Sequence, residues 1–229
     1  MDISRLPERL GGSLTAPNYE SAALLTIDIQ MDTVEPSGPW YDPDSGPMLM
    51  AAAGITRAWR GAGRHIVHVV RLYEEDGSNV DHCRRDRWAQ GWRAVVPETD
   101  GAELAEELRP NANVRLAPQL LLSGEFQLWS GTEAVMYKPR WSAFFGTSLE
   151  RFLTARRIDT VVVVGHMFQN CVRATIQDAT ANDFRVVAVA DAISGNLTDL
   201  ALEELAAWGV SITTAYDVID QIASVGSSS

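Results

Sequence analysis

The sequence has 229 residues, of which 46% are hydrophobic and 21% charged, and its formal net charge is −11. This length and hydrophobic content suffice for one sizeable core, so we expect a single globular domain over residues 1–224, followed by a flexible tail over 225–229. The acidic charge argues against nucleic acid and membrane surfaces as partners, because phosphate binding needs a basic face. The first residues lack the apolar segment of a signal peptide, and no apolar run approaches the roughly 20 residues that span a bilayer, so we expect a cytoplasmic protein.

Short apolar runs alternate along the chain with segments of helical character. The runs predict strands and the segments between them predict helices. The predicted strands are 22–29, 65–72, 134–138, 160–165, 185–190 and 210–213, and the predicted helices are 48–60, 101–108, 146–157, 171–182, 197–208 and 215–224. Residues 73–100 are rich in polar and charged side chains and show no clear hydrophobic period. They predict a long connecting segment outside the sheet, which we call the polar excursion. This alternation indicates an α/β fold with three α/β/α layers and a six-stranded, mainly parallel sheet.

Three reactive side chains follow predicted strands, where the chemistry of such sheets collects. Asp28 ends the first strand, Lys138 ends the third, and Cys171 comes just after the fourth at the start of a helix. Each of the three residues also has a purely structural explanation. The aspartate could cap a turn, the lysine could be a surface residue at a strand end, and the cysteine could be an inert core residue. Their common position at one edge of the sheet favours a catalytic set.

Cys171 has the strongest chemical case of the three. A thiol attacks as the thiolate, and a helix N-terminus and a nearby ammonium from Lys138 would both favour that anion. Asp28 could accept the thiol proton, or hold Lys138, and later return a proton to a leaving amine. Backbone N–H groups before the helix could stabilise an oxyanion. The set is therefore typical of nucleophilic attack on a carbonyl carbon.

The segments that contain these residues resemble the isochorismatase-like cysteine hydrolases, which include nicotinamidases, N-carbamoylsarcosine amidase and ureidoacrylate amidohydrolase. The matching segments are LLTIDIQ at 24–30, KPRWSAFFGT at 138–147 and VVVVGHMFQNCVRATIQDA at 161–179. The resemblance implies the sheet order 3-2-1-4-5-6 and the catalytic triad Asp28, Lys138 and Cys171. It also implies a cysteine-dependent amidohydrolase that cleaves an amide, lactam or ureido C–N bond in a small molecule through a thioester. This strand order places the third strand two positions away from the first. Lys138 must therefore reach Asp28 and Cys171 either through the length of its side chain or from the loop that follows its strand.

The same resemblance implies further site residues. It places a cis peptide between His166 and Met167 and an oxyanion hole at the N–H groups of Met167 and Cys171. Packing, rather than catalysis, is then the expected role of His166. The expected substrate-binding residues are Gln30 and Asn170, which lie in the matching segments, and Trp141, Phe144 and Phe168. Trp141 is expected near the substrate because it closely follows Lys138 in sequence, and the two phenylalanines are expected to line the same pocket. Phe168 and Asn170, together with Arg173, resemble the branch that contains streptothricin hydrolases, so a streptothricin-type lactam is one candidate substrate.

The region after the second strand bears on metal binding. Nicotinamidases hold a metal there with Asp and His residues, whereas this chain has RLYEEDGSNVDHC at 71–83 with His82 as its one histidine. Glu74, Glu75 and Asp76 offer oxygen ligands, or form an exposed acidic loop. His65 and His68 face opposite sides of a strand and cannot share an ion. We expect no metal and no other cofactor.

Two features leave alternatives open. The cluster Arg84, Arg85 and Arg87 is either a solvated surface or a contact for an acidic group of a substrate or partner subunit, and Cys83 beside it is interpreted as a bystander. The tryptophans, among them Trp88, Trp92 and Trp129, suit core, pocket or subunit interface. Proteins of the family that this sequence resembles commonly form homo-oligomers, so we expect a homodimer or homotetramer. The expected partner is a small-molecule substrate. The competing functions are an isochorismatase-type vinyl ether hydrolase, which needs no thiol, and a catalytically idle binding protein.

Overall fold

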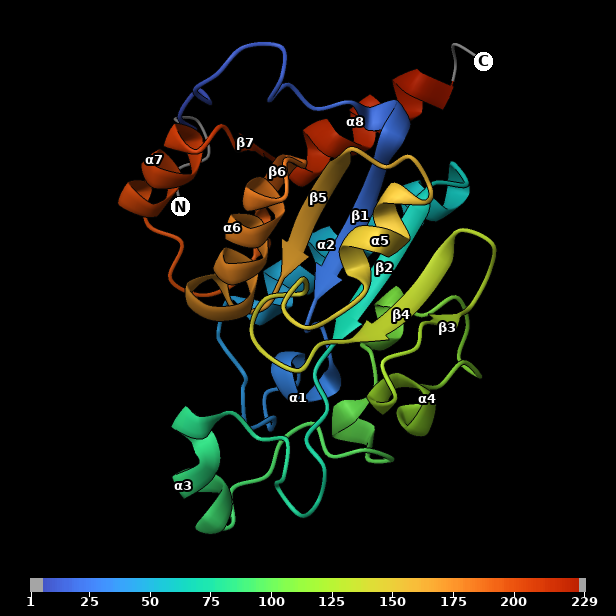
Figure 1. Cartoon of the computed structure of the whole chain (residues 1–229), viewed down its shortest axis with the longest axis vertical. Coiled ribbons are helices and arrows are strands. Elements are labelled where there is room, and N and C mark those ends of the chain that lie inside the picture. The colour runs from blue at the N-terminus through green and yellow to red at the C-terminus, as the bar shows by residue number, and fades with distance from the viewer. Residues whose placement is uncertain (1–5, 227–229) are drawn as a thin grey trace.

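The computed structural model describes residues 6–226. They form three layers, with a central sheet between two layers of helices (Figure 1). The strands are β1 (Ala22–Ile27), β2 (His65–Val70), β3 (Gln127–Leu128), β4 (Glu133–Tyr137), β5 (Thr160–Gly165), β6 (Arg185–Ile193) and β7 (Ser211–Thr213). They lie in the order β3-β4-β2-β1-β5-β6-β7, and every neighbouring pair is parallel except β3 with β4. The six predicted strands and their order are confirmed. The seventh strand, β3, was not predicted, because two residues show no period.

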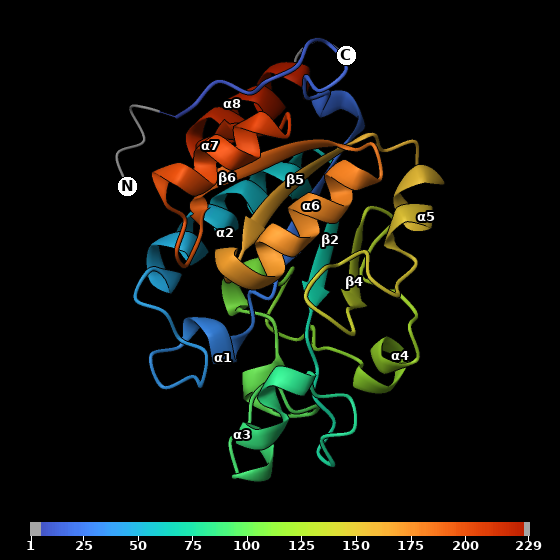
Figure 2. The ribbon, with the colours of Figure 1, turned by 60° about the vertical axis from the view of Figure 1, so that its left-hand side comes forward.

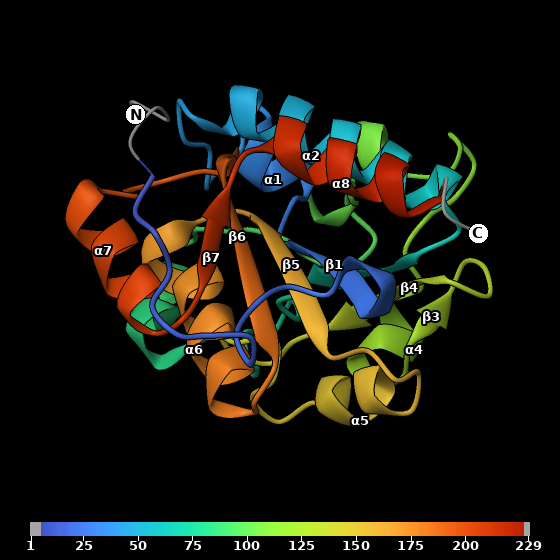
Figure 3. The same cartoon turned by 90° about the horizontal axis from the view of Figure 1, so that it is seen from above.

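Helices cover both faces of the sheet and one of its ends. The helices are α1 (Met31–Val34), α2 (Ser45–Gly61), α3 (Arg85–Ala89), α4 (Pro118–Leu122), α5 (Leu149–Thr154), α6 (Arg173–Ala181), α7 (Asp199–Ala207) and α8 (Ala215–Gly226). Figure 3 shows α2 and α8 on one face and α5 and α6 on the other. None of the helices within residues 6–226 has the length and hydropathy needed to cross a membrane.

One predicted helix is wrong, and the predicted tail stays a prediction. The expected helix over 101–108 is a pair of short 3-10 turns, Asp100–Ala102 and Glu106–Leu108. α8 extends to Gly226, and the remainder of the expected tail over 225–229 lies outside the described residues.

The central strands are buried on both faces, which explains their continuous apolar runs. Leu24 and Val162 pack with Trp59 of α2 on one face. Successive side chains of a strand point to opposite faces, so Leu25 packs on the other face, in the cluster that contains Ile176 of α6.

A buried polar network joins β2 and β4 to α2. The Glu133 carboxylate accepts hydrogen bonds from Arg60 at 2.6 and 2.8 Å, and His68 Nε2 lies 2.9 Å from the same carboxylate. His68 Nδ1 lies 2.8 Å from the Thr26 hydroxyl. Burial lowers the pKa of His68, so the neutral ring accepts from Thr26 and donates to Glu133. Glu133 is only 4% exposed, and both oxygens of its carboxylate have hydrogen-bond partners in this network.

We expect Glu133→Gln to lower the free energy of unfolding at pH 7 by about 3 kcal/mol. Burial alone would raise the pKa of Glu133, but the hydrogen bonds from Arg60 and His68 and the charge of Arg60 outweigh it and lower the pKa to about 2. The carboxylate therefore stabilises the fold above about pH 4.3, the value for an unfolded chain, and this contribution disappears as the pH falls to about 2. Urea unfolding of both proteins between pH 7 and pH 3 measures it.

The difference between Glu133→Gln and wild type should therefore shrink as the solution is acidified. The exposed Glu107, for which the structure shows no ion pair within residues 6–226, provides the matched control Glu107→Gln, which should leave unfolding unchanged. A constant difference at all pH values would contradict the assignment of the low pKa to Glu133.

The polar excursion between β2 and β4 covers the carboxyl end of the sheet. In Figure 1 the strand arrows point towards α1 and α3, which lie at that end. Tyr73, Trp88 and Trp92 pack there with Trp40, with ring centroids 5.4–6.4 Å apart. This aromatic cluster gives the excursion a core of its own beside the strand ends.

Candidate active site

The four central strands each end directly before a residue of the candidate site. Asp28 follows β1, Arg71 follows β2, Lys138 follows β4 and His166 follows β5. Three of these residues extend the backbone pairing by one position: Asp28 donates its N–H to Val69, Lys138 to Val70 and His166 to Ile27, at 2.9–3.1 Å. The sheet itself therefore determines where these residues lie.

The structure brings Asp28, Lys138 and Cys171 into contact. Lys138 Nζ lies 2.8 Å from Asp28 Oδ2 and 3.2 Å from Cys171 Sγ. The lysine starts at β4, two strands away from β1, and its fully buried side chain crosses the end of β2 to reach the other two. Its length therefore bridges the gap that the strand order creates.

Asp28 has an unusual backbone and an unused oxygen. Its φ is 52°, in the left-handed region that aspartate tolerates better than most residues. Its carbonyl accepts a hydrogen bond from the Thr33 hydroxyl, which holds the turn into α1. Within residues 6–226, its buried Oδ1 has no hydrogen-bond partner. One oxygen thus holds Lys138, and the other is available to accept a proton.

Cys171 lies in the turn that connects β5 to α6, and Figure 2 shows α6 packed in front of β5. This turn is π-helical over Phe168–Val172, so Cys171 precedes the α-helix instead of opening it. The peptide between His166 and Met167 is cis, which is the isomer that the family resemblance implies. Phe168 donates its N–H to Ser194 at 2.8 Å, whereas the part of the chain that the structure describes offers no backbone acceptor for the N–H of Met167.

The electrostatics of the resting site differ from the expectation of a thiolate. Burial, reinforced by the negative charge of Asp28, raises the pKa of Cys171 to about 12, although Lys138 opposes the shift. Burial would lower the pKa of Lys138, but the charge of Asp28 and its hydrogen bond to the ammonium raise it above its usual value. The resting site therefore contains a neutral thiol beside an ammonium and a carboxylate.

A small cavity of about 40 Å³ opens beside the thiol, with room for a few water molecules. Its lining residues are Asp28, Trp40, Arg71, Tyr73, Asp81, Arg84, Trp141, His166, Met167, Asn170 and Cys171. Trp141 and Asn170, two of the five expected substrate-binding residues, are among them.

The other three expected substrate-binding residues lie elsewhere. Gln30 is fully buried, and its amide group hydrogen-bonds the backbone of Arg71 and Ala102 at 2.6–2.9 Å, so it ties the excursion to the sheet. Phe168 is 1% exposed and packs in the core, and Phe144 packs against Phe184 with ring centroids 5.7 Å apart. Proximity to the triad in sequence was misleading here, because these side chains point away from the cavity into the core.

His166 takes a structural position beside the triad. Its Nδ1 lies 2.9 Å from the Ser194 hydroxyl, and the side chain is buried. Burial lowers its pKa, so the ring is neutral near pH 7. This agrees with the expectation that packing determines its place.

Several cavity residues were missed by the sequence interpretation. Arg71 and Arg84 both pair with Asp81, at 3.2 and 2.8 Å, and the Tyr73 hydroxyl donates to the same carboxylate at 2.5 Å. The position of Arg71 directly after β2 was a usable signal. Arg84 belongs to the basic cluster whose role the sequence left open, while its neighbours Arg85 and Arg87 are exposed.

The region where nicotinamidases are expected to hold a metal has a different structure here. Across residues 6–226, no three His, Cys, Asp or Glu side chains come close enough to share an ion. Asp76 and Glu74 instead accept hydrogen bonds from Ser78 in an exposed turn. The absence of a metal requirement stays a prediction.

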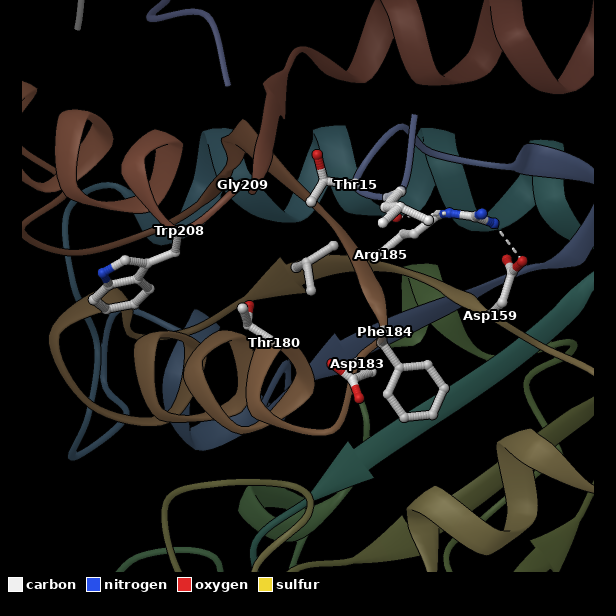
Figure 4. A pocket seen from close by; sticks show the side chains of 10 residues that line it. Thr15, Asp159, Thr180, Asp183, Phe184, Arg185, Trp208 and Gly209 are labelled. Carbon is white, nitrogen blue, oxygen red and sulfur yellow. Dashed lines mark hydrogen bonds and ion pairs between the residues drawn. The ribbon is translucent and has the colours of Figure 1, made fainter. Parts of the chain in front are cut away.

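A separate and larger hollow lies at the opposite end of the sheet (Figure 4). It measures about 510 Å³, and Thr15, Thr180, Phe184 and Trp208 line it beside the Arg185–Asp159 ion pair. It contains no cysteine or histidine and no titratable group with an evident catalytic role, so size alone does not identify the site.

Comparison with known proteins gives a consistent result. The family model described as the isochorismatase domain matches residues 22–217. The chain is 37% identical over 215 residues to a ureidoacrylate amidohydrolase of Methylorubrum extorquens, covering 82% of this chain and 79% of that protein. It is 30% identical to N-carbamoylsarcosine amidase of an Arthrobacter species, covering 72% of this chain and 56% of that protein. It is also 27% identical to the "Probable inactive nicotinamidase" of Arabidopsis thaliana, covering 76% of this chain and 80% of that protein.

Among solved structures, an isochorismatase family protein from Desulfovibrio vulgaris superposes with a TM-score of 0.72. The two chains are 30% identical, and the superposition covers 89% of this chain and 98% of the other.

Proposed function

The chain belongs to the isochorismatase domain family and is a hydrolase acting on C–N bonds, and we propose that it is a cysteine-dependent amidohydrolase with Cys171 as nucleophile. The observation that supports this most is the contact of Lys138 with both Asp28 and Cys171. The relatives named as amidohydrolases support the bond type. The substrate in this proposal is a small amide, lactam or ureide.

The reaction begins with the neutral thiol of Cys171. Asp28 accepts its proton as the sulfur attacks the carbonyl carbon, and the carbonyl electrons move onto oxygen. The N–H groups of Met167 and Cys171 donate to that oxyanion. The C–N bond then breaks, and Asp28 returns the proton to the leaving nitrogen, which leaves a thioester on Cys171. Water, deprotonated by Asp28, attacks the thioester, and the released thiolate regains its proton.

Lys138 acts on the charge that appears at sulfur. Its ammonium lies 3.2 Å from Sγ and is held by Asp28, so it stabilises the thiolate as the proton leaves. The raised pKa of Lys138 keeps it protonated throughout. Lys138 therefore supplies the electrostatic stabilisation, and Asp28 is the group that moves protons.

The alternatives have weaker support. A vinyl ether hydrolase needs no thiol, and an idle binding protein needs no intact triad. The presence of all three residues in contact favours hydrolysis of a C–N bond. We further propose a cytoplasmic homodimer or homotetramer that uses no metal, with a streptothricin-type lactam as one substrate to test.

The test is hydrolysis of a panel of amides, lactams and ureides, followed by trapping of the intermediate. Acid quench of the wild-type enzyme during turnover should leave the acyl group on the peptide that contains Cys171, detected by mass spectrometry. Turnover without any Cys171 adduct, for a substrate whose initial burst of released amine shows that an intermediate accumulates, would contradict the mechanism. Addition of a chelator should leave the rate unchanged if no metal takes part.

A further inference from the structure

The cavity beside the thiol is too small to hold a whole substrate. It measures about 40 Å³, whereas sites for small molecules commonly measure about 300–1,000 Å³. It has room for the reacting amide group beside Cys171 and for little else. Any larger part of the substrate must therefore lie outside this cavity.

An open groove of about 480 Å³ adjoins the cavity. Asp81 and Trp141 line both, so the two spaces share a wall. The groove is also lined by Phe145, in the loop between β4 and α5, and by Asp178 of α6. Asp178 follows Cys171 by seven residues, which is about two helical turns, so the groove extends about 10 Å along α6 away from the thiol.

The surface that the groove offers to a ligand is mainly apolar. The rings of Phe145 and Trp141 are 60% and 38% exposed. Several of the polar lining groups are already engaged within the protein. The Asp81 carboxylate accepts hydrogen bonds from three side chains, the Ser142 hydroxyl accepts a backbone N–H at 3.1 Å, and Arg140 donates to a backbone carbonyl at 2.6 Å. A ligand in the groove therefore contacts exposed aromatic rings, which bind apolar groups well.

The proposed reaction determines which part of the substrate faces the groove. Asp28 returns its proton to the leaving nitrogen, so this nitrogen must face Asp28. That residue is 5% exposed and lines the small cavity but not the groove, which leaves no space for a large substituent on nitrogen. The acyl group, in contrast, stays bonded to Cys171 as the thioester, and the groove lies beyond the shared wall.

We propose that this groove binds an extended apolar substituent on the acyl side of the substrate, against Trp141 and Phe145. The inference rests on the proposed function and names its substrate class. The groove has the volume that the catalytic cavity lacks, and it is continuous with that cavity through Asp81 and Trp141. The part of the substrate that does not react is therefore its occupant.

The test is a series of straight-chain primary amides from propanamide to octanamide. The added methylene groups lie far from the carbonyl and hardly change its reactivity, so kcat/KM reports how well they bind. Each should raise kcat/KM by about 2-fold or more, which makes octanamide at least about 30-fold better than propanamide for wild type. In Phe145→Ala this ratio should fall by at least about 5-fold, because an exposed ring that the chain would cover is gone.

Leu128→Ala is the matched control, because Leu128 is 62% exposed but lies on β3, outside the groove, and it should keep the wild-type ratio. N-pentylpropanamide, an isomer of octanamide with the chain on nitrogen, should react more slowly than octanamide. A smaller rise for wild type, a ratio that survives Phe145→Ala, or an N-pentyl isomer that reacts as fast as octanamide would overturn the inference and leave the proposed function intact.

A binding measurement decides the inference even if no panel amide is hydrolysed, a result that would count against the proposed function alone. Octanamide should raise the Tm of wild type more than propanamide does at the same concentration, since a ligand that binds the folded state stabilises it. Leu128→Ala should keep this difference and Phe145→Ala should lose it. No difference for wild type, or an equal one in Phe145→Ala, would overturn the inference.

Light scattering tests the competing occupant, which is a second copy of the chain. Phe145→Ala should have the same molecular mass in solution as wild type. Dissociation of the variant into a smaller species would show that a subunit interface covers the groove, and would overturn the inference.

Discussion

Cys171→Ala should lower kcat/KM for the best panel amide by at least about 10,000-fold, the loss typical of removing a catalytic nucleophile. The reason is that Asp28 and Lys138 remain but no sulfur is left to form the thioester, so water would have to attack the amide directly. The measurement is initial-rate kinetics with purified protein. Circular dichroism and thermal unfolding should show that the variant stays folded, because the alanine removes one atom from a partly exposed position.

Cys83 provides the matched control for this variant. It is an exposed cysteine in the polar excursion and has no contact with the triad. Cys83→Ala should therefore retain wild-type kcat/KM. If Cys171→Ala keeps full activity, or if Cys83→Ala loses it, the assignment of the nucleophile is wrong.

Asp28→Asn should separate the reactivity of the thiol from turnover. Hydrolysis should fall by about 1,000-fold or more, because no group remains to take the thiol proton and return it to the leaving nitrogen. The pKa of Cys171, however, should fall, because the charge of Asp28 is one of the causes that raise it to about 12 in the native site. The variant should therefore be less active while its thiol is alkylated faster near neutral pH.

The measurement is the rate of iodoacetamide labelling of Cys171 between pH 6 and pH 10, with Cys83 replaced by alanine in all proteins. In wild type the rate should still be rising at pH 10, and in Asp28→Asn the rise should begin at lower pH. Asp44→Asn, at an exposed aspartate outside the cavity, should reproduce the wild-type profile. A labelling profile for Asp28→Asn that is unchanged, or shifted to higher pH, would contradict the proposed coupling.

Asp28→Asn also tests the buried ion pair with Lys138. Removal of one partner leaves a fully buried ammonium with less compensation, which costs about 3–5 kcal/mol in comparable pairs. Thermal unfolding should accordingly show a lower Tm for the variant, and the labelling should be done well below it.

Much of the fold was determined by local patterns in the sequence. Short, valine-rich apolar runs such as 160–165 favour strands covered on both faces, and their alternation with helices indicates a parallel sheet. The placement of Asp28 and Lys138 also followed locally, because both residues directly succeed a strand. The strand β3 and the 3-10 turns over 100–108 were not predictable, since their few residues have no period.

By itself, the sequence determined which reactive residues stand at the carboxyl end of the sheet: Asp28, Lys138 and Cys171. Only the tertiary structure decided how they act, because the protonation of a thiol depends on burial and on charges brought from other strands. It likewise decided that Gln30 supports the backbone while Arg71 and Arg84 border the cavity. These assignments depend on where a side chain lies relative to residues far away in the chain, and periodicity within a segment contains no information about that.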